Sequence, residues 1–141
     1  MTHFGQINIA FGWMTIVLGI LSGSVLGLWS FAGPFKAPPG HQNYTDLSRR
    51  MTRLAHIAFF ALPIISILYG QYIDLIPVSD SLKMLGSHCW LVCMWGVPTL
   101  LIAAAMYNPI KYLEVIPVTC GTIALFIMAY GHFVLFFSAP A

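Results

Sequence analysis

The sequence predicts an all-α membrane protein, with four transmembrane helices in an up-down antiparallel bundle. Hydrophobic residues make up 59% of the 141 residues and charged residues only 7%, whereas a soluble domain carries about 25% charge. The mean hydropathy is +0.84. Four apolar stretches, at 7–31, 52–75, 82–107 and 110–137, each hold the roughly 20 residues needed to cross the hydrocarbon core of a bilayer.

The pattern within these stretches favours helices over a β-barrel. Only helices and closed barrels span a membrane, because every backbone polar group must be satisfied internally. Barrel strands alternate between apolar and polar residues, and the runs 57–68 and 123–137 do not alternate. Short links between the stretches favour antiparallel neighbours. We therefore expect residues 1–141 to form a single four-helix domain.

The first stretch is expected to stay in the protein as a helix that packs closely. It lacks the preceding basic residues and the small-residue cleavage site of a signal peptide. Gly19, Gly23 and Gly27 form a doubled small-xxx-small repeat, which lets two helix backbones approach in a membrane. The contacting helix belongs either to this chain or to another subunit.

The three links between the stretches carry turn residues. The proline-rich loop 33–48 cannot form regular helix, and Asp46 or Ser48 is expected to cap the second helix. A short link at 76–81 leads into the third helix. Asn108 and Pro109 make a tight turn before the fourth.

The placement of the basic residues predicts an orientation. Five of the six lie in or beside the first and third loops, and Lys83 lies by the second; the five are Lys36, Arg49, Arg50, Arg53 and Lys111. Because cytoplasmic loops collect Lys and Arg, loops one and three are expected in the cytoplasm. We therefore expect a multi-pass protein of a bacterial inner membrane, with both termini outside, on the periplasmic side.

Two histidines are candidates for a cofactor site. His88 lies near the start of the third helix and His132 near the end of the fourth, so antiparallel helices place both at a similar depth below the outer surface. Facing histidines on neighbouring helices can be the axial ligands of a b-type haem. The alternative is that each is a structural histidine that bonds to a neighbouring group.

A cluster of basic residues lies on the predicted cytoplasmic side of the membrane. Arg49, Arg53 and His56 share one face of the second helix, and Arg50 stands beside that face. Arginines at such a position extend to lipid head groups, and a guanidinium also suits a quinone, a haem propionate or a partner's carboxylate. The sequence therefore predicts a basic cytoplasmic rim that contacts lipid, quinone or a partner protein.

Metal binding is an alternative role for other residues. Cys89 and Cys93 share a helix face and, with Cys120, lie inside predicted spans, so a disulfide framework is not expected. They are either buried structural residues or a metal or redox pair. His3 could complete a copper or zinc site, together with residues of the same outer end: Asp74, Asp80 or Met84.

These features favour an interaction protein over an enzyme. The chain has no Gly-rich phosphate loop, no H-E-x-x-H and no G-x-S-x-G motif, and its net charge of +2 does not favour nucleic acid. We expect a small non-catalytic integral membrane subunit of a larger bacterial respiratory or photosynthetic redox complex, with other membrane subunits and lipid as partners. The alternatives are a membrane cytochrome with haem b between His88 and His132, or a metal-handling membrane protein.

Overall fold

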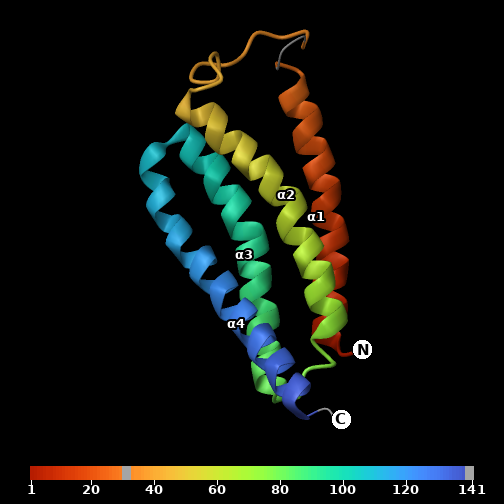
Figure 1. Cartoon of the computed structure of the whole chain (residues 1–141). Helices are drawn as coiled ribbons and strands as arrows, with labels where there is room; N and C mark the ends of the chain where they lie inside the picture. Colours follow the sequence, from red (N-terminus) through yellow and green to blue (C-terminus); the bar gives the residue numbers. More distant parts are fainter. Residues whose placement is uncertain (30–32, 139–141) are drawn as a thin grey trace.

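The computed structural model of the protein describes residues 1–29 and 33–138. It contains α1 (His3–Gly27), α2 (Leu47–Tyr72), α3 (Asp80–Met106) and α4 (Val115–Ser138), with a 3₁₀ helix η1 (Asn108–Glu114) before α4. All four long helices are long and apolar enough to cross a membrane. Successive helices run in opposite directions, so α1 begins and α4 ends at the same end of the bundle (Figure 1). The predicted four-helix up-down architecture is confirmed.

The helices extend beyond the apolar stretches because their starts are set by polar residues outside them. α1 begins at His3, where the Thr2 hydroxyl accepts a hydrogen bond from the Gly5 amide. Asp46 takes the N-cap position of α2 without a side-chain capping bond, because its carboxylate accepts from the Asn43 amide instead. The predicted end of the first span, at Phe31, lies outside the described residues.

Two prolines explain why the fourth span begins as a 3₁₀ helix. Pro109 occupies the first turn of η1, and Pro117 lies in the first turn of α4. A proline has no amide hydrogen and its ring clashes with the carbonyl four residues earlier, so it fits the first turn of an α-helix better than the interior. The regular α-helix therefore starts only at Val115 rather than at the expected residue 110.

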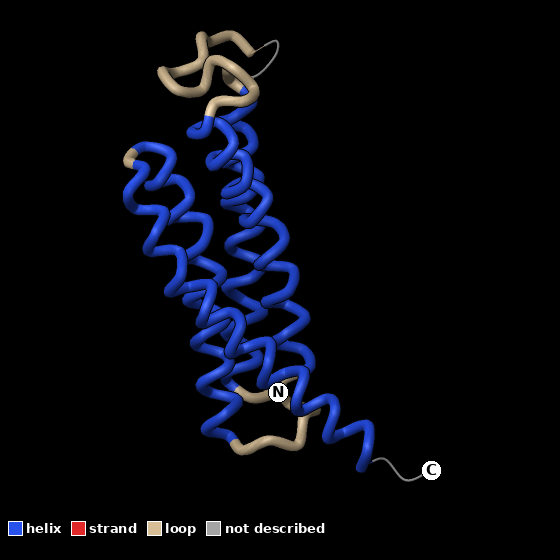
Figure 2. Tube along the Cα trace, turned by 60° about the vertical axis from the view of Figure 1, so that its left-hand side comes forward, coloured by secondary structure: helices blue, strands red, loops and turns tan. Residues whose placement is uncertain are grey.

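The main helix contacts follow the order of the chain. α1 packs on α2, α2 on α3 and α3 on α4, with a weaker contact between α1 and α3. Figure 1 shows α1 and α4 on opposite sides of the bundle, and Figure 2 shows the long loop at one end of the bundle and both termini toward the other. Each of these two helices therefore leaves much of its surface to lipid or to a partner.

The contact between α1 and α2 is close because α1 presents small residues to it. Its buried positions follow one another three or four residues apart: Gly5, Asn8, Gly12, Thr15 and Gly19. A Cβ atom added to Gly5 would lie 2.6 Å from the Gly70 carbonyl oxygen, and one added to Gly19 would lie 2.9 Å from that of Phe59. In lipid, such close backbone approach replaces the hydrophobic drive that holds soluble helices together.

The three glycines of the repeat predicted from the sequence do not all have the same role. Gly19 packs against the Phe59 carbonyl, which has no helical partner because Pro63, four residues later, lacks an amide hydrogen. Gly23 packs against the ring of His56, whereas no described atom lies within 4 Å of where a Cβ of Gly27 would stand. The first two glycines therefore serve contacts within the chain, and Gly27 borders open space.

A buried polar cluster joins three helices near one end of the bundle. Asn8 of α1, Ser66 of α2 and Ser87 of α3 are fully buried. The Asn8 amide donates to the Ser87 hydroxyl, and the Ser66 hydroxyl donates to the Asn8 carbonyl at 3.0 Å. Interhelical hydrogen bonds of this kind stabilise membrane bundles, so the cluster fixes how α1, α2 and α3 meet.

We expect Asn8→Leu to destabilise the bundle by about 1–2 kcal/mol, the range for interhelical hydrogen bonds in model membrane helices. Leucine has as many side-chain heavy atoms as asparagine, so the substitution removes the side-chain bonds of Asn8 to Ser87 and Ser66 with little loss of packing. The bond from Ser66 to the backbone carbonyl of residue 8 remains. Unfolding by SDS from mixed micelles, followed by the fluorescence of the buried Trp90, measures the change.

Ser24→Ala is the matched control for this prediction. Ser24 is an exposed polar residue of the same helix, and its hydroxyl bonds only to the Ile20 carbonyl of its own helix. Equal effects of the two substitutions would contradict a special role of the buried cluster.

Candidate functional site

His88 lies on the side of α3 that meets α1. Its Nδ1 bonds to the Met84 carbonyl at 2.8 Å, and its ring meets the ring of Phe4 edge to face, with 6.5 Å between centroids. The side chain is otherwise exposed. Because a carbonyl only accepts, Nδ1 carries a proton and Nε2 is left free.

His132 lies between α4 and α2 instead. Its Nδ1 bonds to the Met128 carbonyl at 3.0 Å, and its ring meets Tyr72 of α2, 6.0 Å away between centroids. It also lines an apolar pocket of about 190 Å³ formed by α2 and α4. This volume is below the roughly 300 Å³ from which small-molecule pockets usually start.

The two candidate haem ligands therefore face different helices. His88 contacts α1 and His132 contacts α2, and His88 does not line the pocket that His132 borders. Two axial ligands must present Nε2 atoms to opposite faces of one macrocycle. The contacts of the two rings do not favour such an arrangement, and the haem hypothesis stays a prediction.

The cysteines meet at the contact between α3 and α4. All three are free thiols. Cys89 of α3 lies near Cys120 of α4, and Cys93 packs where a Cβ of Gly121 would stand, with Sγ at 2.4 Å from that position. Cys93 of α3 thus occupies space left by Gly121 of α4. Within residues 1–29 and 33–138, no group of three or more His, Cys, Asp or Glu side chains is placed to hold a metal ion.

At the end of the bundle where α1 begins, polar residues connect the loop between α2 and α3 to α1. The backbone amide of Thr2 donates to the Asp74 carboxylate at 2.6 Å, and Lys83 donates to the Asp74 carbonyl at 3.5 Å. Partial burial raises the pKa of the Asp74 carboxyl, but the hydrogen bonds with Thr2 and the neighbouring positive charges outweigh this and hold the pKa below its usual value. Asp74 therefore has a structural role at the start of α1.

The basic residues at the opposite end enclose a pocket of about 300 Å³ between α1, α2 and the loop that joins them. Trp29 and Tyr44 border it from the loop side, and the remaining lining residues come from the two helices: Gly23, Leu26, Gly27, Arg49, Arg53 and His56. The sequence predicted that Arg49, Arg53 and His56 share a face of the second helix, and all three line this one pocket. We call it the basic pocket.

Neighbouring groups orient both arginines and the histidine of the basic pocket. The guanidinium carbons of Arg53 and Arg49 lie 4.2 and 5.7 Å from the centroid of the same ring, that of Tyr44, so cation–π attraction draws both toward it. Nδ1 of His56 lies 2.9 Å from the Ser22 hydroxyl. That hydroxyl gives its only proton to the Gly19 carbonyl, so it accepts from His56 and leaves Nε2 of the ring free.

Arg50 is separated from this pocket. It lines a second groove on the other side of α2, with apolar residues of α2 and α3 and with Lys111, Tyr112 and Glu114 from η1. Arg53 borders both spaces. The predicted basic rim is thus two neighbouring sites, and the one with Arg50 also contains a carboxylate.

Several residues of the basic pocket could not be selected from the sequence. Tyr44 and Trp29 stand in or beside a loop without periodicity, and Ser22 is one of several small residues of α1. Only the path of the loop brings Tyr44 onto the arginines. Asn8 could have been selected, because a polar amide within an apolar stretch requires a partner.

Comparisons with protein-family models, curated proteins and solved structures find no match to this chain.

We expect purified protein to show no spectrum of a haem held by His88 and His132 together, because their rings contact different helices. The measurement is the dithionite-reduced minus oxidised absorption spectrum of protein extracted in a mild detergent. A stoichiometric Soret band that disappears in both His88→Ala and His132→Ala would contradict this expectation. Tyr72→Phe, which keeps the ring beside His132, is the matched control.

Proposed function

We propose that the chain is a small non-catalytic integral membrane subunit of a larger membrane complex, where it acts through surfaces inside the bilayer. A bacterial respiratory or photosynthetic complex is the proposed context. The observation that carries the proposal is an aromatic stripe on α4.

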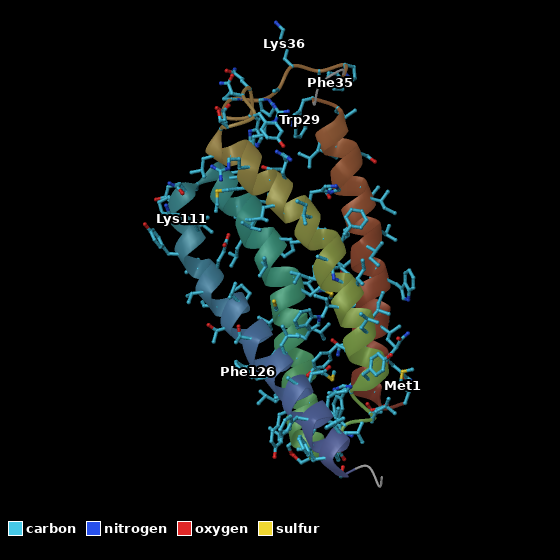
Figure 3. All side chains as sticks on the ribbon, viewed as in Figure 1. Met1, Trp29, Phe35, Lys36, Lys111 and Phe126 are labelled. Atoms are coloured by element: carbon cyan, nitrogen blue, oxygen red, sulfur yellow. The ribbon has the colours of Figure 1, made fainter. Side chains whose placement is uncertain are left out.

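The stripe runs along the outer side of α4. It consists of four aromatic residues, each at least 61% exposed, at successive spacings of four, three and four: Phe126, Tyr130, Phe133 and Phe137. Figure 3 shows Phe126 on the outer side of the helix, away from its neighbours. Residues at this spacing form the ridge with which one helix packs into the groove of another.

The opposite side of α4 is made of small residues and packs on α3. Its buried positions are Pro117, Gly121, Ala124 and Gly131. The two faces lie about 180° apart at 100° per residue, so the stripe points directly away from the bundle. α4 therefore uses small residues for its contact within the chain and leaves its large rings for an outside surface. Aromatic side chains are enriched in the core of protein interfaces.

The distribution of mass supports the same proposal. Four helices of 24 to 27 residues account for most of residues 1–141, so most of the surface of this segment is helix surface inside the bilayer. What the chain offers to other proteins is mainly helix surface.

We expect wild-type protein, extracted gently, to migrate in a native gel within an assembly much larger than the 15.6 kDa chain. Phe133→Ala should weaken this association by about ten-fold or more if the ring is a central contact, equivalent to about 1.4 kcal/mol or more. Mass spectrometry of the large band identifies the partner subunits and tests the redox context.

Phe136→Ala is the control, because Phe136 is also exposed on α4 but points about 60° away from Phe133 around the helix. Wild-type protein that migrates as the lone chain would contradict the proposed function. Equal losses in the two variants would contradict the role of the stripe.

We also propose the orientation, with loops one and three in the cytoplasm and the termini outside. Lys36 and Lys111 lie at one end of the bundle and Met1 at the other (Figure 3). The basic residues of α2 lie at the end with Lys36, so that end carries five of the six Lys and Arg side chains. Positively charged segments are retained on the cytoplasmic side.

Single-cysteine labelling tests the orientation. Thr45→Cys and Ser81→Cys place a thiol at exposed positions of opposite ends, in a chain whose three native cysteines are replaced by alanine. With a membrane-impermeant maleimide on spheroplasts, we expect position 81 to react at once and position 45 only after lysis. The reverse pattern would overturn the orientation.

A further inference from the structure

The basic pocket has an excess of positive charge that none of the described residues neutralises. Arg49, Arg53 and His56 line it, and none of its lining residues is acidic. Asp46, the nearest acidic residue in sequence, bonds to Asn43. In the described parts of the chain, neither arginine forms an ion pair with a carboxylate. Two adjacent guanidinium groups without a counter-ion favour an anionic ligand.

The donors of the pocket are already oriented for such a ligand. Tyr44 lies beneath both guanidinium groups, and Ser22 fixes the ring of His56. Orientation before binding lowers the entropy that a ligand must overcome. The free Nε2 of His56 adds an acceptor for a hydroxyl group, or a donor when the ring is protonated.

The walls of the pocket indicate that the anion carries apolar chains. Leu26 and Trp29 line it beside the arginines, and Gly27 leaves open space, with no atom of the described residues within 4 Å of where its Cβ would be. The neighbouring turn of α1 exposes Val25 and Leu28 to the outside. The pocket stands where an apolar helix ends and a polar loop begins, at the depth of lipid phosphates.

We propose that the basic pocket binds the head group of an anionic phospholipid, with Arg49 and Arg53 on the phosphodiester and His56 on a hydroxyl of the head group. The acyl chains lie along the exposed side of α1 next to Gly27. Phosphatidylglycerol has this chemistry, a monoanionic phosphodiester that carries hydroxyl groups. The site is independent of whether the chain belongs to a larger complex.

Native mass spectrometry of the full chain in a mild detergent, titrated with phosphatidylglycerol, tests this site. We expect Arg49→Gln to weaken the first bound lipid about five-fold, because one basic residue at a membrane surface contributes about 1 kcal/mol. Arg50→Gln is the matched control: it removes the same charge from the next residue, which lines the other groove, and should change binding less than two-fold.

Gly27→Leu tests the pocket without changing its charge. The added side chain enters the open space and should also weaken phosphatidylglycerol about five-fold, while thermal unfolding of the lipid-free protein stays unchanged. This variant keeps the test valid if Arg49→Gln loosens the loop, since Arg49 also donates to the His41 and Gln42 carbonyls.

Two further ligands test whether the pocket requires a net negative charge and whether it requires an intact lipid rather than a soluble phosphodiester. Phosphatidylcholine, which has no net charge, should bind at least five-fold more weakly than phosphatidylglycerol. Water-soluble glycerophosphoglycerol should bind far more weakly than the intact lipid. Equal binding of phosphatidylcholine, equal losses in Arg49→Gln and Arg50→Gln, or full affinity for the soluble head group would each overturn the proposal.

Discussion

The close approach of α1 to α2 is the contact on which the rest of the bundle depends. Lipid is as apolar as the helix surfaces, so burial alone gives little drive for association. Small residues of α1 let the two backbones touch at Gly5 and Gly70, and the cluster around Asn8 ties the same seam to Ser66 and Ser87. Because α3 joins this cluster, the position of α1 on α2 also fixes where α3, and through it α4, can pack.

The close packing of helices through small residues also determines which side chains lie on the outer surface of the bundle. α1 and α4 use small residues for their contacts within the chain, such as Gly12 on α1 and Gly121 on α4, and leave their large side chains on the outside. Large side chains are buried between α2 and α3 instead, where Tyr69 stacks on Trp90. The aromatic stripe of α4 and the aliphatic face of α1 therefore follow from how the helices hold together. This distribution of side chains provides surfaces for other membrane proteins, which is the basis of the proposed role as a subunit.

The two ends of the bundle differ in charge and in structure. One end is tied by Asp74, which accepts the Thr2 amide within the chain. The other holds Arg49 and Arg53 on one tyrosine ring, with no carboxylate among the residues that line their pocket. The charges of the first end are used inside the fold, whereas those of the second are oriented and unpaired. This asymmetry separates the structural end from the end at which we propose an anionic ligand.

The sequence by itself determined the class of the protein, the four spans, their alternating direction and the shared face of Arg49, Arg53 and His56, because apolar length and helical periodicity are local properties. It placed the span ends several residues off, since Thr2 and Asp46 begin the helices outside the apolar segments. Only the tertiary structure decided that His88 and His132 face different helices, that Gly27 borders open space and that Tyr44 reaches the arginines. Those facts depend on the rotation of each helix about its axis and on the path of a loop, which are set by contacts between residues far apart in the chain.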